Sequence, residues 1–192
     1  MIQVSEHSER RVVVVGAGVS GVQTAVALRE HGWSGRITVI GEETHQPYDR
    51  PPLSKALLTG TVESPAFEVD FSALDIELLL GRRAVELRHD EHTVITDAGP
   101  VGYDTAVLAT GTEAVLLPGM ERDAPGVHLL HTLDDAVALR PVLARRSRVV
   151  VVGAGWIGAE FTTAAREAGC EVTVVEAADR PLAGVLPAEV TT

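Results

Sequence analysis

The sequence has 192 residues and a net charge of −11; hydrophobic residues make up 45% of it and aromatic residues only 4%. This composition excludes a disordered or fibrous chain and favours a soluble globular protein in which small side chains pack helices onto a sheet. The acidic balance argues against nucleic acid or an anionic membrane as a partner, and the single cysteine, Cys170, excludes an internal disulfide or a redox cysteine pair.

The N-terminal residues are polar and lead into a short valine run that ends at a glycine, "MIQVSEHSERRVVVVG". A signal peptide or a membrane-spanning helix needs a longer apolar stretch than this. We therefore predict a cytoplasmic protein.

An internal repeat organises the chain. The stretch "RRVVVVGAGVSGVQTAVALREHG" at 10–32 matches "SRVVVVGAGWIGAEFTTAAREAG" at 147–169 without a gap. Each copy reads as a β-branched strand, a glycine-rich turn, a helix of small residues and a terminal glycine, followed by a second strand, "RITVI" or "EVTVV". The repeat predicts two βαβ units.

Each turn carries the pattern GxGxxG, in which the first glycine allows a tight turn, the second lets a pyrophosphate approach and the third lets helix and strand pack closely. The phosphate would lie at the helix N-terminus, where free amides favour an anion. An acid follows the second strand of each copy and would accept the ribose hydroxyls: Glu42, with Glu43 as backup, and Glu176. Glu176 favours NAD over NADP, although Arg180 nearby weakens that preference.

The loop "PYDRPPLSK" at 47–55 follows the first copy. Its consecutive prolines fix φ and remove amide donors, so the loop is predicted to be stiff and extended. It either aims a side chain, with Arg50, Ser54 and Lys55 as candidates, or simply connects two elements.

Between the two copies the hydrophobic period changes. The runs "IELLLG", "RAVELRHDEHTVITDAG" and "YDTAVLATG" predict a small antiparallel meander that returns to a central strand at 104–109. The following "ATG" either lets Gly111 approach a ligand or is a plain turn that ends the strand. The predicted fold class is α/β: two Rossmann-like βαβ units with an antiparallel β-meander between them, in three ββα layers.

With these motifs the chain resembles the N-terminal part of the two-dinucleotide flavoprotein reductases. Within them it is most similar to the ferredoxin, rubredoxin and putidaredoxin reductases of oxygenase systems, a branch of the pyridine nucleotide-disulfide oxidoreductase superfamily that lacks the redox cysteine pair. The stretches that carry the resemblance are both repeat copies, "GEETHQPYDRPPLSKALLTG" and "YDTAVLATG". The loop is the most specific of them.

The resemblance implies that residues 1–115 bind FAD and residues 116–192 bind NADH, with no metal. It places Lys55 near the flavin, paired with Glu160, as catalytic residues, and Arg50 at the FAD pyrophosphate. The cofactor-binding residues it implies are Gly16, Ala17, Gly18, Val19, Ser20, Gly21, Glu42, Arg50, Lys55, Val85, Ala109, Thr110, Gly111, Gly153, Gly155, Trp156, Ile157, Gly158, Glu160 and Glu176. His131 stands where the family commonly has an arginine that contacts FAD, and the arginine usual near Ala114 or Val115 is missing.

The implied function is electron transfer from NADH through FAD to a small ferredoxin-like iron-sulfur protein. The family continues past the position of Thr192, so we expect an N-terminal portion of such a reductase. The alternative is a naturally short, inactive nucleotide-binding or partner-interaction module of the same fold. The sequence does not indicate an oligomeric state.

Overall fold

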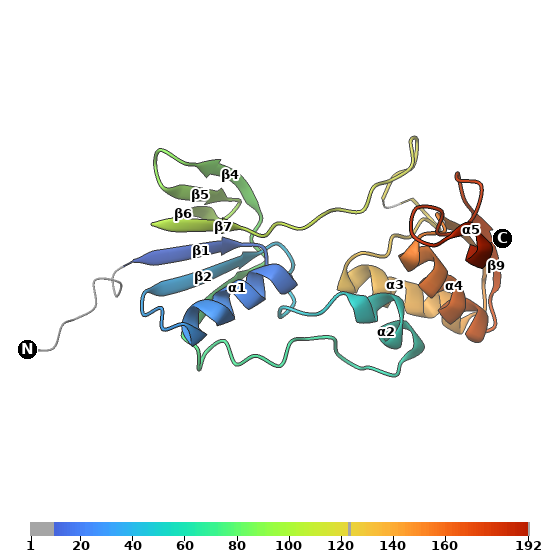
Figure 1. The fold of residues 1–192 in the computed structure, drawn as a ribbon, viewed down its shortest axis with the longest axis horizontal. Coiled ribbons are helices and arrows are strands. Elements are labelled where there is room, and N and C mark those ends of the chain that lie inside the picture. The colour runs from blue at the N-terminus through green and yellow to red at the C-terminus, as the bar shows by residue number, and fades with distance from the viewer. Residues whose placement is uncertain (1–9, 123, 192) are drawn as a thin grey trace, which may run out of the picture. The chain divides into compact units, whose positions relative to one another are not determined.

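The structure is a computed structural model that describes residues 10–122 and 124–191. These residues form two compact units (Figure 1). The first unit contains residues 10–49 and 66–112, and the second contains residues 50–65 and the described residues from 113 to 191. The segment 50–65, which includes most of the proline-rich loop, therefore packs with the second unit. The predicted domains, 1–115 and 116–192, were divided by the cofactor that each is expected to bind, and this division stays a prediction.

The first unit is built on a parallel sheet. Its strand order is β3-β2-β1-β7. The strands are β1 (Arg11–Val15), β2 (Arg36–Gly41), β3 (Ile76–Leu80) and β7 (Thr105–Leu108). Two details of the prediction are wrong. The strand expected to be central, β7, lies at the edge of this sheet and pairs only with β1 among the described strands. The run expected in the meander, β3, instead pairs with β2 in parallel, because its first residue, Ile76, is buried in the core beneath the helix.

Three layers make up this unit, as the sequence predicts. The outer layers are helix α1 (Val19–Glu30) and an antiparallel meander of β4 (Ala84–Arg88), β5 (Thr93–Thr96) and β6 (Gly99–Gly102). Alternate residues of β1 face the two layers: Val12 and Val14 pack in the cluster that contains Val22 of α1, whereas Val13 and Val15 pack with Val94 of the meander. A strand covered on both faces reads as a continuous apolar run, which is why four valines stand in a row.

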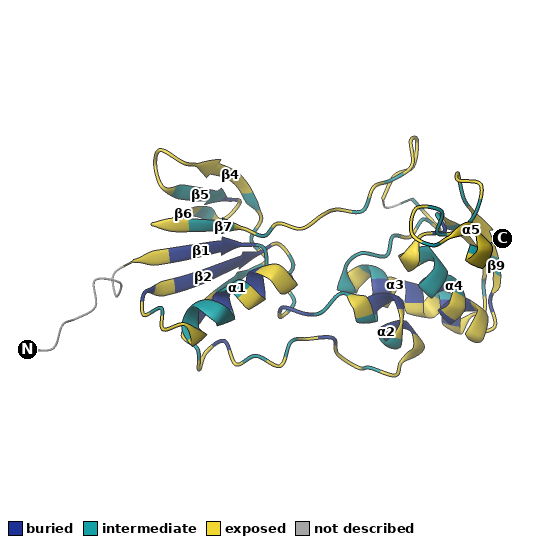
Figure 2. Ribbon diagram, in the orientation of Figure 1, coloured by how far each residue is buried: buried dark blue, intermediate teal, exposed yellow. Residues whose placement is uncertain are grey.

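The second unit repeats the βαβ pattern and adds helices. Its elements are the 3-10 helix η1 (Pro51–Ser54), α2 (Ala56–Thr59), α3 (Leu133–Ala144), β8 (Arg148–Val152), α4 (Trp156–Glu167), β9 (Glu171–Val175) and α5 (Ala188–Thr191). Strands β8 and β9 pair in parallel. The prediction of an extended proline-rich loop is wrong: Arg50 has helical φ and ψ, and Pro51–Ser54 form a 3-10 helix, because the φ of proline also suits the first turn of a helix. Buried leucines of η1 and α2, Leu53 and Leu57, anchor the proline-rich segment within the unit. Figure 2 shows that β1 and β2 of the first unit are largely buried, whereas β8 and β9 contain no buried residue.

Within residues 10–122 and 124–191, no helix has the length and apolar character needed to cross a membrane.

Candidate dinucleotide and redox site

The first glycine-rich turn has the geometry that its sequence requires. Gly16 has φ +116°, and its amide donates to the carbonyl of Ile40 at 2.8 Å. A Cβ atom at Gly16 would lie 2.0 Å from the carbonyl oxygen of Ala109, and one at Gly21 would lie 1.9 Å from that of Gly16. Gly18, by contrast, has nothing within 4 Å of its Cβ position. Two glycines are therefore required for close backbone packing, and the middle one leaves room for a ligand.

The second turn repeats this geometry. Gly153 has φ +100° and donates its amide to Val175 at 2.8 Å. A Cβ at Gly158 would lie 2.1 Å from the carbonyl oxygen of Gly153, while the Cβ position of Gly155 is open. The one difference is at Gly153, whose Cβ position is also open because the described part of this unit has no strand in the place of β7.

Both turns fit a dinucleotide pyrophosphate. Each leads into a helix of 12 residues whose N-cap, Gly18 or Gly155, offers no side-chain cap, and neither helix has an acidic residue in its first turn. Helix N-terminal amides without an internal partner bind anions, and here no acidic side chain of the helix's own first turn lies beside them. Of the neighbouring residues in the prediction, Val19, Ser20, Trp156 and Ile157 are exposed and Ala17 is partly buried.

The two acids predicted to bind ribose differ in their surroundings. Glu42 is exposed and lies 3.7 Å from Arg83 in an ion pair. Glu176 accepts hydrogen bonds from the backbone amides of Ala178 (2.9 Å) and Ala154 (2.5 Å). These bonds, with that from Ala178 the largest cause, lower the pKa of Glu176. Its carboxylate is thus fixed beside the second glycine-rich turn.

The backup acid, Glu43, is already engaged. It accepts a hydrogen bond from the hydroxyl of Tyr48 at 2.5 Å. Glu42 is therefore the better candidate for a ribose in the first unit.

Lys55 and Glu160 form the ion pair that the sequence predicts. The Lys55 Nζ lies 2.9 Å from Glu160 Oε1, and the other carboxylate oxygen, Oε2, accepts a hydrogen bond from the Ser54 hydroxyl. Burial raises the pKa of Glu160. The hydrogen bond from Ser54 and the hydrogen bond and charge of Lys55 together lower this pKa by more than burial raises it, so the net change is downward. Glu160 is thus held as a carboxylate. The catalytic roles of Lys55 and Glu160 stay predictions.

The predicted pyrophosphate ligand, Arg50, lies in the second unit and contacts His131. The distance from Arg50 Nη1 to His131 Nε2 is 2.6 Å. His131 thus occupies a position next to a predicted cofactor ligand, an arrangement that sequence reasoning did not anticipate. Its role and that of Arg50 toward FAD stay predictions.

The remaining predicted cofactor residues lie at strand ends of the first unit. The amide of Ala109 donates to Val15 at 2.8 Å, and Gly111 has φ +70° with open space at its Cβ position. Thr110 lies between them. Val85 is an exposed residue of β4 next to an irregularity in the pairing of that strand.

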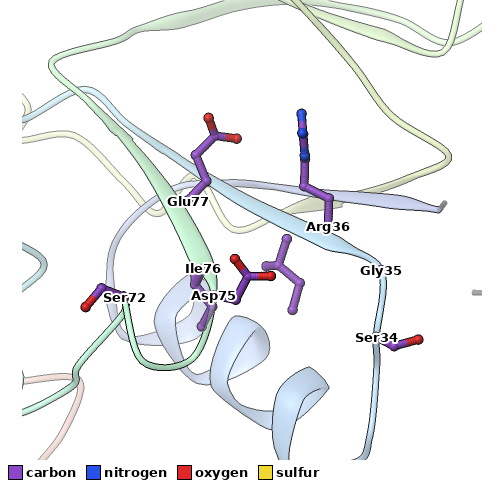
Figure 3. Close-up of a pocket in the computed structure, with 8 residues that line it drawn as sticks. Ser34, Gly35, Arg36, Ser72, Asp75, Ile76 and Glu77 are labelled. Atoms are coloured by element: carbon purple, nitrogen blue, oxygen red, sulfur yellow. The ribbon is translucent and has the colours of Figure 1, made fainter. Parts of the chain in front are cut away.

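A polar hollow opens at the other end of the same sheet (Figure 3). It is lined by residues at the start of β2 and β3 and just before them: Ser34, Gly35, Arg36, Ile37, Ser72, Asp75, Ile76 and Glu77. The glycine-rich turn follows the carboxyl end of β1, where parallel sheets bind ligands. The hollow is therefore separate from the predicted nucleotide site.

A family comparison agrees with this geometry. The model of the pyridine nucleotide-disulphide oxidoreductase family matches residues 10–192. The chain belongs to this family.

Several curated proteins and solved structures are similar to the chain. Rhodocoxin reductase of Rhodococcus erythropolis is 43% identical over 91% of this chain and 42% of its own length. The ferredoxin–NAD(+) reductase subunit of the benzene 1,2-dioxygenase system of Pseudomonas putida is 42% identical over 91% of this chain and 44% of its own. The crystal structure of the covalent putidaredoxin reductase–putidaredoxin complex matches with a TM-score of 0.90 and 37% identity, over 95% of this chain and 46% of that one. The chain thus spans less than half the length of these relatives.

The sequence has a single cysteine, although the family is named for disulphide oxidoreductases. Cys170 is buried, and its thiol points to the carbonyl of Leu143 at 3.9 Å. Within this sequence Cys170 therefore has no second cysteine with which to form a redox pair, and the catalytic role of the Lys55–Glu160 pair stays a prediction. The sequence marked Ser54 as a candidate in the loop but gave it no role. Its position next to Lys55 was the only sign in the sequence that it could also contact Glu160.

Proposed function

We propose that the chain is the dinucleotide-binding part of an FAD-dependent NADH:ferredoxin reductase that serves an oxygenase system. The observation that carries this proposal is the occurrence of two geometrically matched glycine-rich turns together with the Lys55–Glu160 pair in place of a cysteine pair. The names of its relatives, which are ferredoxin–NAD(+) and rhodocoxin reductases, support the same assignment.

FAD would bind at the first turn and NADH at the second. When bound, the cofactors supply the redox chemistry: hydride transfer from the nicotinamide to the flavin and single-electron release to an acceptor. The residues of the chain would bind and orient the two cofactors. Gly18 and Gly155 leave space for a pyrophosphate, Glu42 and Glu176 accept ribose hydroxyls, and Lys55 supplies a positive charge where negative charge develops on the reduced flavin.

The second turn is suited to NADH rather than NADPH. A fixed carboxylate at Glu176 would repel a 2′-phosphate. The guanidinium of Arg180, a group that attracts phosphate, is engaged within the chain. It donates to the carbonyls of Leu186 (2.9 Å) and Ala183 (3.0 Å) and to the Thr191 hydroxyl (2.5 Å). We therefore assign Arg180 a structural role in the segment after β9.

The acceptor would be a small ferredoxin-like iron-sulfur protein. This choice of acceptor is supported by the names of two relatives, a rhodocoxin reductase and the ferredoxin–NAD(+) reductase subunit of a dioxygenase system. A cytoplasmic location also stays a prediction.

Cofactor binding and flavin reduction test this function. Purified protein that contains this chain is titrated with FAD, followed by visible absorbance, and then mixed anaerobically with NADH in a stopped-flow instrument. We expect a yellow protein whose flavin absorbance is lost on mixing. A colourless protein that binds no FAD would contradict the proposal and favour the inactive nucleotide-binding module.

The Lys55–Glu160 pair has its own test in a double-mutant cycle. Flavin reduction rates are measured for the wild type, Lys55→Met, Glu160→Gln and the double variant. We expect a coupling energy above about 0.5 kcal/mol, because residues in contact have non-additive effects. Additive effects would mean that the pair plays no joint role in the reaction.

A further inference from the structure

The carboxylate of Glu160 is held by two consecutive residues. Ser54 donates its hydroxyl to Oε2, and Lys55 places its Nζ 2.9 Å from Oε1. Each oxygen of the carboxylate therefore has its own donor, one neutral and one charged, and both donors come from the end of η1. Sequence separates Ser54 from Glu160 by 106 positions.

The two donors differ in mobility. Ser54 is 5% exposed and is one of three buried polar residues in the described segments, while the Lys55 side chain is 50% exposed. One side-chain torsion, χ1, places the oxygen of a serine. Four torsions place the amino group of a lysine, so the lysine loses more entropy when it is held in one position. Half-exposed ion pairs also contribute little in water. Ser54 is therefore the better candidate to fix the orientation of the carboxylate, and Lys55 supplies the charge.

The backbone on each side of this contact is anchored. Pro51 and Pro52 open η1, and Leu53 and Leu57 are buried on either side of the Ser54–Lys55 step. On the other side, the residue after Glu160 in α4, Phe161, is also buried. Neither partner can move away from the other without exposing apolar side chains, which keeps the Ser54 hydroxyl at the carboxylate.

The proposed function gives the Ser54 hydroxyl no task of its own. Removing it would leave Oε2 without its donor in a partly buried place, which is unfavourable for a carboxylate. The opposing influences on the pKa of Glu160 agree with this: burial raises that pKa, and the Ser54 hydrogen bond is the largest influence that lowers it.

We propose that Ser54 is a positioning residue that orients the Glu160 carboxylate toward Lys55 and keeps it ionised for flavin reduction. This inference rests on the proposed function for its catalytic part. The positioning itself is a property of the second unit and is testable without any cofactor.

The first experiment measures the pKa of Glu160 directly. The carboxyl carbon of Glu160 is assigned in glutamate-labelled protein by its loss in Glu160→Gln, and its NMR signal is followed as pH changes. We expect Ser54→Ala to raise the pKa of Glu160 and Ser54→Cys, which keeps a weaker donor of similar size, to raise it less. The control is Thr163→Val, which removes a hydroxyl from the same helix, one that donates to Ala159 instead. An unchanged pKa in Ser54→Ala, with circular dichroism like that of the wild type, would overturn the proposal.

The second experiment measures flavin reduction by NADH across pH. We expect Ser54→Ala to slow it on the order of tenfold at pH values below the wild-type pKa of Glu160, the factor that the loss of one hydrogen bond to a charged group implies. The acid limb of the rate profile should move to higher pH by the same amount as the NMR titration, whereas a merely structural role would lower the rate evenly at all pH values. A raised pKa with an unchanged rate profile would overturn the catalytic part and the proposed role of Glu160. An unchanged pKa would overturn the proposal for Ser54 and leave the proposed function of the chain intact.

Discussion

The pentapeptide RVVVV occurs twice in this protein, as β1 and as β8, with different surroundings. In β1 all four valines are buried, whereas in β8 burial alternates. The clearest contrast is at the second valine: Val13 is 1% exposed and Val150 is 64% exposed. The first strand has a neighbour on each side and a layer on each face, whereas β8 pairs only with β9 among the described strands.

Local geometry, however, is the same in both copies. The first glycine has a positive φ and donates to the end of the neighbouring strand at 2.8 Å, and a 12-residue helix starts after the second glycine. Turn and helix start are thus properties of the repeated sequence, while burial depends on what the rest of the chain supplies. Three pairs of matched substitutions test this difference, and one further variant tests the carboxylate beside the second turn.

The largest effect is expected for Gly16→Ala compared with Gly153→Ala. Both replace a glycine of positive φ, which costs on the order of 1–3 kcal/mol. Only at Gly16 does the new Cβ also overlap the backbone, at 2.0 Å from Ala109, which adds on the order of 1–3 kcal/mol or more. Urea unfolding would follow the fluorescence of Trp33 in the first unit or of Trp156 in the second, with the other tryptophan replaced by phenylalanine. Equal losses in the two variants would mean that a further segment packs on Gly153 in solution.

Removal of the ribose acids should affect the two cofactors separately. We expect Glu42→Ala to weaken FAD binding and Glu176→Ala to weaken NADH binding, each by about 1.5–3 kcal/mol for a lost hydrogen bond to a charged group. Isothermal titration of both variants with both cofactors measures this. Loss of FAD affinity in the Glu176 variant would show that the two sites are assigned in reverse.

Val13→Thr and Val150→Thr test the difference in burial itself. The two residues have nearly the same shape, so the main change is a hydroxyl group. In the core at Val13 it should lower the free energy of unfolding by about 1–3 kcal/mol. At exposed Val150 the change should stay within about 0.5 kcal/mol. A comparable loss at Val150, measured by urea unfolding, would show that the outer face of β8 is covered in solution.

The smallest effect concerns acid stability. The pKa of Glu176 is lowered in the folded chain, chiefly by the hydrogen bond from Ala178 and then by that from Ala154. A carboxylate with a lowered pKa stabilises the fold above its unfolded pKa, and this contribution is lost as pH falls through the folded pKa. Below about pH 5 the wild type should therefore lose stability more steeply than Glu176→Gln. Urea midpoints from pH 7 to pH 3 measure the slopes, and parallel curves would contradict the role of this carboxylate.

Much of the fold was predictable because each copy of the repeat has clear local sequence patterns for its strands, its turn and its helix. The strands, the glycine turns, the helices and the acids after the second strands all follow from residues within about 30 positions of one another. The terminal glycines after the two helices, Gly32 and Gly169, both have the positive φ that a helix C-terminus favours. The meander was also predictable, because its short alternating runs match antiparallel pairing.

Most of the errors and omissions involve long-range contacts; the exception is the proline-rich loop, which was predicted to be extended and contains a 3-10 helix. The sequence of β3 suits either a meander or a parallel strand, and only burial of Ile76 in the core beneath α1 decides between them. The edge position of β7 likewise depends on which strands pair with it. The Ser54–Glu160 hydrogen bond joins residues 106 positions apart, and no local pattern indicates it.

By itself, the sequence determined the two glycine turns and the helices that follow them, because φ preferences, side-chain size and helix propensity act over a few residues. Only the tertiary structure decided that the proline-rich loop packs in the second unit and that its serine, Ser54, joins Lys55 at the Glu160 carboxylate. It also decided that one RVVVV strand is buried and the other is half open. Burial and pairing are set by apolar area shared between distant segments, and that area exists only once the segments are packed.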